Sequence, residues 1–311
     1  MRVGVTGASG LVGHALVEAL HERDDTTVIF VRPSSAPASN DTVRWDPARG
    51  VIDEGDLNRV GGLDAVVNLA GAGIGDRRWN ESRKREILDS RVAATTLLVS
   101  ALGELSNGGG FLANASAIGW YGSRGDENLD EASTRGEGFL SDVCVAWEKA
   151  TSPLEVLGLD VAHARSGVVL SSRGGAFKKQ LPLFRSGLGG RYGAGSQWMS
   201  VISLHDEVRA LLWTIDHRLT GPVNLVAPQP ITNREFTRVL ARILRRPAAL
   251  NVPSWTLRAV LGAEMADELI LTSQRVTPTS LRSSNFKFEH DDANEALKWV
   301  LRSTGSKSGS H

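Results

Sequence analysis

The sequence predicts an α/β fold in which a doubly wound, mostly parallel sheet is joined to a smaller C-terminal α/β region. Short apolar runs typical of buried strands occur at residues 3–6, 27–31, 63–69, 111–115 and 161–170. Segments with apolar residues at helical spacing separate these runs, at residues 11–23, 81–105 and 140–154. Because helical crossovers between strands produce a parallel sheet covered on both faces, the alternation predicts this fold class.

Composition narrows the class of protein. The 311 residues carry 35 basic and 35 acidic side chains, and 41% of the residues are hydrophobic. Balanced charge argues against a protein that binds nucleic acid or a membrane surface, because both usually need a basic excess. The single cysteine, Cys144, excludes an internal disulfide. We expect a cytoplasmic protein without a signal peptide or a membrane helix.

The clearest motif is TGASGLVG at residues 6–13, between the first predicted strand and the first predicted helix. Gly7 permits a tight turn, Gly10 leaves the backbone open to a pyrophosphate, and Gly13 lets the helix pack closely on the sheet. The helix start offers free N–H groups and a partial positive charge to phosphates. The motif therefore predicts a Rossmann-type dinucleotide site. Its phosphate-binding residues are Gly7, Ser9, Gly10, Leu11, Val12 and Gly13.

The residues after the second predicted strand select the cofactor. NAD sites usually place an acidic residue there, which binds the ribose hydroxyls. This chain instead has Arg32, a planar and permanently charged donor suited to a 2′-phosphate, and Ser34 can add a hydroxyl. We therefore predict NADP as the cofactor, with NAD as the alternative.

Three further segments resemble the extended branch of the short-chain dehydrogenase/reductase superfamily, the NAD-dependent epimerase/dehydratase-like proteins. They are residues 68–71 (NLAG), 116–122 (SAIGWYG) and 165–170 (RSGVVL). Residues 45–47, 181–185, 187–190 and 274–278 narrow the resemblance to an atypical subgroup of nucleoside-diphosphate-sugar epimerases that has a C-terminal extension. The resemblance spans about residues 1–302. It implies that Leu69, Ala70, Gly71, Gly167 and Val168 also contact the cofactor.

The chain departs from that family at the acid/base pair. Active members use a Tyr and a Lys four residues apart, so that both share one helix face. Here the two tyrosines, Tyr121 and Tyr192, have no lysine four residues later, and Phe139 stands near the expected tyrosine. Asp142 and Val143 lie near the expected lysine. The fold alone therefore does not establish an activity.

Two residues remain as catalytic candidates. Ser116 ends a predicted strand at the edge where ligands bind, and this position favours a site role over a hydroxyl that caps a turn. Tyr121 is the only tyrosine near that edge, and a half-buried loop aromatic is an equal alternative. A metal site is not expected, because the acidic loop at 126–131 lacks nearby His or Cys. Cys144 is interpreted as a buried structural thiol, and residues 205–207 as a helix cap.

The chain is divided into a dinucleotide-binding domain at 1–170, a substrate-binding region at 171–302 that can interleave with it, and a disordered tail at 303–311. Two functions follow. One is an NADP(H)-dependent oxidoreductase or epimerase-like enzyme that acts on a carbonyl or nucleotide-sugar-like substrate. The other is a non-catalytic NADP(H)-binding sensor or interaction protein. The expected partners are the dinucleotide and a small molecule, without nucleic acid or membrane, in a monomer or homodimer.

Overall fold

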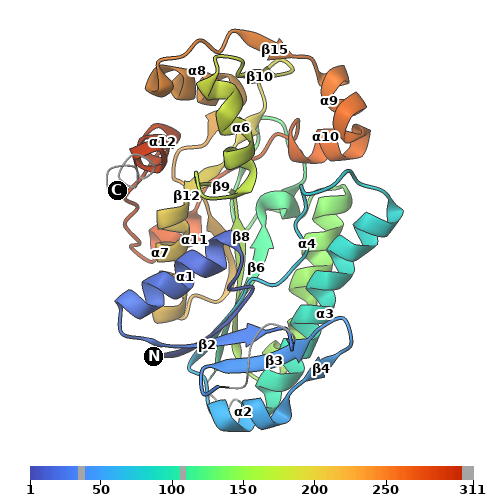
Figure 1. Ribbon diagram of the computed structural model, residues 1–311, viewed down its shortest axis with the longest axis vertical. Helices are drawn as coiled ribbons and strands as arrows, with labels where there is room; N and C mark the ends of the chain where they lie inside the picture. The colour runs from blue at the N-terminus through green and yellow to red at the C-terminus, as the bar shows by residue number, and fades with distance from the viewer. Residues whose placement is uncertain (34–38, 106–109, 303–311) are drawn as a thin grey trace, which may run out of the picture.

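The computed structural model describes residues 1–33, 39–105 and 110–302. Its centre is an eight-stranded sheet in the order β13-β8-β6-β5-β1-β2-β3-β4 (Figure 1). All neighbouring strands are parallel except β4, which runs antiparallel to β3. The strands are β1 (Arg2–Thr6), β2 (Thr26–Val31), β3 (Thr42–Asp46), β4 (Val51–Ile52), β5 (Ala65–Asn68), β6 (Phe111–Ala117), β8 (Asp160–Ser166) and β13 (Gly221–Leu225).

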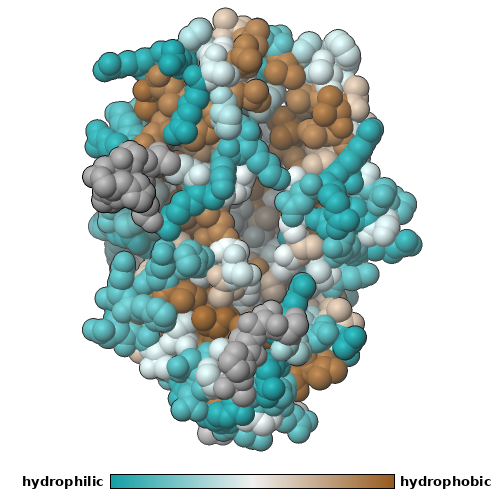
Figure 2. Space-filling model, in the orientation of Figure 1, coloured by the Kyte–Doolittle hydropathy of each residue, from teal (hydrophilic) through white to brown (hydrophobic). Residues whose placement is uncertain are grey.

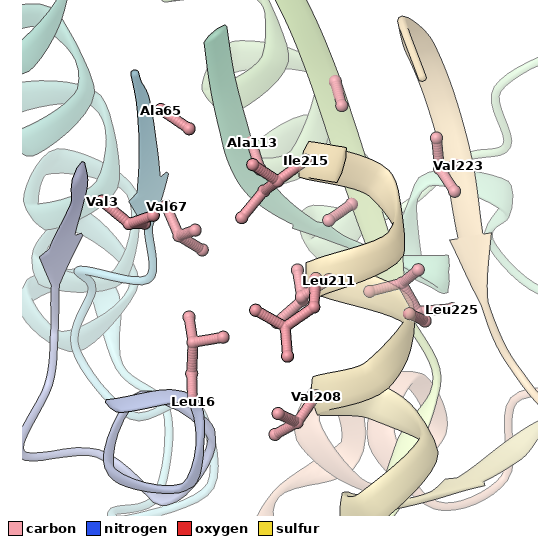
Figure 3. Packing of buried hydrophobic residues seen from close by; sticks show 14 of the residues in the cluster. Val3, Leu16, Ala65, Val67, Ala113, Val208, Leu211, Ile215, Val223 and Leu225 are labelled. Atoms are coloured by element: carbon pink, nitrogen blue, oxygen red, sulfur yellow. The ribbon is translucent and has the colours of Figure 1, made fainter. Parts of the chain in front are cut away.

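Helices cover both faces of the sheet, which confirms the predicted doubly wound class. On one face, α1 (Leu11–Glu22) and α7 (Leu204–Asp216) pack their apolar sides onto valines and alanines of β1, β5, β6, β8 and β13 (Figure 3). On the other face lie α2 (Glu54–Val60), α3 (Glu81–Leu105) and α5 (Ser152–Val156), with α4 (Phe139–Lys149) packed against α3. Burying these apolar surfaces on a common sheet is the main stabilisation of the fold.

The C-terminal segments form a smaller region above the carboxyl edge of the sheet (Figure 1). Its core joins α6 (Gly175–Arg185), α8 (Asn233–Leu244) and α12 (Ala293–Arg302). The strands β10 (Gly190–Tyr192) and β15 (Leu250–Val252) pair in parallel, and α9 (Ser254–Leu261) and α10 (Ala263–Leu269) follow. Because β13 and α7 return to the main sheet, the chain after residue 170 contributes to both layers, and the division at 170 stays a prediction.

Several elements differ from the sequence-based expectation. The glycine-rich stretch contains α6, whose Phe177, Leu181 and Phe184 are buried at helical spacing despite the surrounding glycines. Gly167 separates β8 from β9 (Val168–Leu170), and Gly262, with φ of 93°, separates α9 from α10. The sequence did not predict β3, β4, α2 or α12. Ser34 and the tail at 303–311 lie outside the described residues.

The remaining short elements connect these layers. They include β9, which pairs in parallel with β12 (Val201–Ser203), and the antiparallel pair β11 (Trp198–Met199) and β14 (Ile231–Thr232). Two more strands, β7 (Asn128–Leu129) and β16 (Arg275–Val276), also pair in parallel. The short helices η1 (Ile118–Tyr121) and α11 (Thr279–Ser283) complete the described chain. No helix among the described residues is both long and apolar enough to cross a membrane.

Candidate dinucleotide site and its surroundings

The parallel sheet brings the predicted site segments to one edge. β1 pairs in parallel with β2 and β5, β5 pairs in parallel with β6, and β6 pairs in parallel with β8. The carboxyl ends of these strands therefore lie at the same edge of the sheet. The loops that leave Thr6, Val31, Asn68, Ala117 and Ser166 therefore gather above the sheet. In Figure 2 the surface is hollowed near the centre of this face, between the sheet and the upper helices. This is the edge at which open α/β sheets bind ligands.

The turn at residues 6–13 is shaped by contacts that only glycine allows. Gly7 has φ of 65°, and a Cβ on it would lie 2.7 Å from the carbonyl oxygen of Leu69. A Cβ on Gly13 would lie 2.3 Å from the carbonyl oxygen of Gly7, so α1 approaches the turn more closely than any side chain permits. Gly10 is exposed at the N-cap of α1, where no side chain caps the helix. The helix start therefore offers backbone N–H groups to an anion.

The other residues predicted at this turn lie around it. Ser9 is exposed beside Gly10, whereas Leu11 and Val12 are half-buried in the first turn of α1. Leu11 also approaches the start of α6, since a Cβ on Gly174 would lie 3.2 Å from its Cδ1. The first turn of α1 thus contacts the C-terminal region directly.

A buried polar network supports the segment at 69–71, and no motif in the sequence predicts it. The Thr6 hydroxyl donates to Asn68 Oδ1 at 2.7 Å and accepts from the backbone N–H groups of Leu69 and Ala70 at 3.0 and 3.1 Å. The Asn68 amide donates to Asn114 Oδ1 at 2.7 Å and to Thr95 at 2.9 Å. Because these buried groups satisfy one another, the network holds the turn and the 69–71 segment in one arrangement.

Arg32 is exposed directly after β2 ends at Val31. Its side chain forms no ion pair within residues 1–33, 39–105 and 110–302. A free guanidinium at the end of the strand beside β1 fits recognition of a 2′-phosphate. On the opposite side of the edge, Gly167 is packed so tightly that a Cβ would lie 2.5 Å from the carbonyl oxygen of Ser200. Val168, the next residue, is half-buried.

Ser116 lies near the end of β6 and is 4% exposed. Its hydroxyl donates to Glu148 Oε1 at 2.6 Å. Arg165 holds the same carboxylate with two hydrogen bonds, both 2.8 Å, from Nε and Nη2. Arg165 thus holds both oxygens of the carboxylate, and the hydroxyl proton of Ser116 is directed at Oε1. Ser116 therefore presents lone pairs, and not its proton, to any ligand above it.

The surroundings of Tyr121 weigh against a role as catalytic acid, which stays a prediction. It has no exposed surface, and its hydroxyl donates to Asn224 Oδ1 at 2.8 Å and accepts from Arg165 Nη1 at 3.1 Å. Burial raises the pKa of Tyr121 to about 12. A phenol that no substrate can reach, with its proton already donated, is unsuited to act as a catalytic acid. The sequence showed its place in the loop after β6, but not that the loop folds inward.

Phe139 begins α4, at the place where the family resemblance led us to expect a tyrosine. Its ring packs edge-on against Trp79, with centroids 5.1 Å apart, and Lys84 Nζ lies 5.1 Å from the ring centroid. The backbone N–H groups of Phe139 and Leu140 donate to the carboxylate of Glu268 at 2.9 and 2.7 Å. Phe139 therefore supplies no proton at the position expected for the tyrosine.

The remaining candidates have structural roles. Cys144 is buried, as expected, and burial raises the pKa of its thiol to about 11. Glu131 of the acidic loop accepts three backbone hydrogen bonds, from Asn224, Thr279 and Ser280, and is not simply solvated. Within the described ranges, no three His, Cys, Asp or Glu residues are grouped so that they could hold a metal ion.

The segment at 205–207 differs from its interpretation as a cap. The N-cap of α7 is Ser203, whose hydroxyl accepts from the N–H of Asp206, and residues 205–207 form the first turn. Glu207 is 1% exposed, and its Oε1 accepts from the Ser166 hydroxyl at 2.5 Å. Its Oε2 has no hydrogen-bond partner. Burial raises the pKa of Glu207 to about 8.

The glycine turn, the parallel sheet and the upper region together define a dinucleotide-binding α/β protein of the extended short-chain dehydrogenase/reductase type. Comparison with known proteins gives the family. The model of the NAD dependent epimerase/dehydratase family matches residues 3–139, and a domain of unknown function, DUF1731, matches residues 252–300. An epimerase family protein of Mycobacterium bovis is 44% identical over 304 residues, which cover 97% of this chain and 98% of the relative. The chain belongs to this epimerase family.

Solved structures agree with this assignment. The human epimerase family protein SDR39U1, crystallised with NADPH, is 30% identical with a TM-score of 0.85, covering 97% of this chain and 99% of that one. A nucleoside-diphosphate sugar epimerase from Corynebacterium glutamicum is 34% identical with a TM-score of 0.76, covering 97% of this chain and 58% of that one. The similarity confirms the predicted fold and family, and the cofactor in the human relative agrees with the predicted NADP.

Proposed function

We propose that this chain binds NADP(H) at the carboxyl edge of its sheet. The observation that carries the proposal is the glycine turn, where a Cβ on Gly13 would fall 2.3 Å from the Gly7 carbonyl oxygen and where Gly10 leaves the start of α1 uncapped. Backbone packed this closely fits a pyrophosphate that needs direct access to N–H groups. The segments 69–71 and 167–168 lie at the same edge and are the proposed further contacts of the dinucleotide.

The proposed activity is that of an oxidoreductase or epimerase-like enzyme acting on a carbonyl or nucleotide-sugar-like substrate. Bound NADPH would supply a hydride, and the upper region would close the site against water. Reduction of a carbonyl also needs a proton donor, and two residues of this chain that stand near the expected position do not supply one. Phe139 has no ionisable proton, and the Ser116 proton is committed to Glu148. Turnover would therefore be slow and directed toward reduction, with its proton drawn from outside the usual tyrosine position.

The second candidate function is a non-catalytic NADP(H)-binding sensor or interaction protein. The burial of Tyr121 favours it, because this removes the sequence's best substitute acid from the site. Tight NADPH binding without turnover across a screen of carbonyl compounds and nucleotide sugars would support the sensor function. Turnover of any of these substrates would support the enzyme. A cytoplasmic location and a monomeric or homodimeric state stay predictions.

The cofactor is tested by replacing Arg32 with alanine and titrating NADPH and NADH calorimetrically. We expect Arg32→Ala to weaken NADPH by about 1.5–3 kcal/mol, because a charge-assisted contact to the 2′-phosphate is lost, and to leave NADH nearly unchanged. Arg49, exposed in a loop after β3, gives the matched control Arg49→Ala, which should bind both dinucleotides as the parent does. Equal weakening of NADPH and NADH by Arg32→Ala would overturn the preference for NADP.

A further inference from the structure

Arg91 of α3 is a buried cation without a counter-charge. Only 7% of the residue is exposed, and it forms no ion pair with any acid of the described chain. By contrast, the buried carboxylates of Glu148 and Asp56 are paired with Arg165 and Arg44. Burying an unpaired charge is unfavourable, so such a residue is unusual unless something else provides the missing negative charge.

The contacts of Arg91 hold it in place without neutralising it. Nη1 donates to the carbonyl oxygens of Ala72 and Ile87 at 3.0 and 2.9 Å, and the guanidinium lies 4.9 Å from the ring centroid of Trp147. Nε has no hydrogen-bond partner. Burial lowers the pKa of Arg91 to about 10, so the group is still positively charged at neutral pH.

Arg91 lies directly under the floor of the proposed dinucleotide site. A Cβ on Gly71 would come within 3.1 Å of Arg91 Cγ and 3.2 Å of Cζ, so Gly71 packs directly against the Arg91 side chain. Gly71 itself is exposed, and the two residues before it are bonded to the Thr6 hydroxyl that precedes the glycine turn. The segment at 69–71 therefore links the buried Arg91 to the glycine turn that follows Thr6.

We infer that Arg91 is a second cation of the dinucleotide site, in addition to Arg32, and that it stabilises bound NADP(H) electrostatically. This inference rests on the proposed function. NADP(H) carries several negative charges, and a low-dielectric interior strengthens their attraction to a fixed cation. The free protein bears the cost of a buried charge, and binding of the dinucleotide offsets it. Arg91 is thus a binding residue that resemblance to the family did not identify.

Arg83 provides a matched control on the same helix. It is also buried, at 6% exposed, and it also donates to the loop after β5, at the carbonyl oxygen of Gly73. Unlike Arg91, it is paired with an acid, since Nη1 lies 2.7 Å from Glu86 Oε2. If the arginines acted only by holding the loop, replacing either one would have the same effect on NADPH binding.

The test measures the NADPH dissociation constant and the thermal stability of the free protein for Arg91→Met, Arg91→Lys and Arg83→Met. We expect Arg91→Met to bind NADPH about 10- to 100-fold more weakly than the parent. The melting temperature of free Arg91→Met should be unchanged or higher, because an unpaired buried charge is gone. Arg91→Lys should recover part of the affinity, whereas Arg83→Met should lower the melting temperature and change NADPH binding less.

Each other outcome overturns the inference. Parent-like NADPH binding by folded Arg91→Met would show that the charge does not act on the dinucleotide. Weaker binding by Arg91→Met and Arg83→Met alike, with equal losses of stability, would show that both only hold the loop. Should Arg91→Met not fold, the inference is wrong, because a necessary structural role would explain the buried arginine. A parent protein that does not bind NADPH would instead overturn the proposed function itself.

Discussion

Replacing Gly13 with alanine tests the geometry of the glycine turn most directly. Gly13 is buried in the first turn of α1, and an added Cβ would lie 2.3 Å from the Gly7 carbonyl oxygen and 2.9 Å from the Ala8 Cα. Both of these atoms belong to the backbone, so no side-chain rotation can relieve the contact. The helix and the turn must separate instead.

The size of the effect follows from that distance. A carbon and an oxygen in normal contact lie roughly 3.3 Å apart, so α1 and the turn must move apart by ~1 Å. Inserting a methyl group into a packed site costs about 1–3 kcal/mol of unfolding free energy. The same shift pulls the N–H groups at Gly10 away from the phosphates. NADPH binding should therefore weaken by more than about tenfold.

The assay combines urea denaturation with calorimetric titration of NADPH, and Gly62→Ala is the control. Gly62 lies in a loop before β5, and a Cβ on it meets no atom within 4 Å. Gly62→Ala should match or slightly exceed the parent in stability and should bind NADPH equally well. If Gly13→Ala kept both the stability and the NADPH affinity of the parent, the close approach of α1 to the turn would be wrong.

Two further predictions concern the buried polar groups. Tyr121→Phe removes the partner of Asn224 Oδ1 and of Arg165 Nη1, so the unfolding free energy should fall by about 1–3 kcal/mol while NADPH affinity stays within about threefold of the parent. Lost affinity at unchanged stability would instead support Tyr121 as a site residue. Burial raises the pKa of Glu207 from 4.5 to about 8 in the folded protein. The contribution of Glu207 to the free energy of unfolding is therefore fully present below pH 4.5 and is lost as the pH rises to about 8. Glu207→Gln should therefore gain stability relative to the parent between pH 5 and pH 8 in urea denaturation, and a difference that does not change with pH would refute this.

Local patterns in the sequence predicted most elements of the first half of the fold, although not β3, β4 or α2. The spacing of Gly7, Gly10 and Gly13 identified the phosphate turn, because each glycine permits a turn or a close backbone contact with residues nearby in the sequence. The apolar periodicity at 81–105 predicted α3 with the bounds that the structure has. The strands β1, β2, β5 and β6 were also found, since buried parallel strands are short, continuous apolar runs.

The sequence could not show which polar residues meet. Ser116 donates to Glu148, 32 positions away, and Tyr121 donates to Asn224, 103 positions away. Neither partner stands out in the sequence, because a carboxylate or an amide on a helix or strand is usually exposed. The order of strands in the sheet brings these residues together, and that order depends on long-range pairing.

The sequence by itself determined that this chain is a doubly wound α/β protein with a dinucleotide turn and without the usual tyrosine and lysine. Only the tertiary structure decided that Tyr121 is enclosed, that Glu207 is buried with one oxygen unpaired, and that Arg91 lies uncompensated beneath Gly71. Local geometry depends on neighbouring residues and can be predicted from spacing. Burial and charge pairing depend on distant segments, and packing alone determines which of those segments meet.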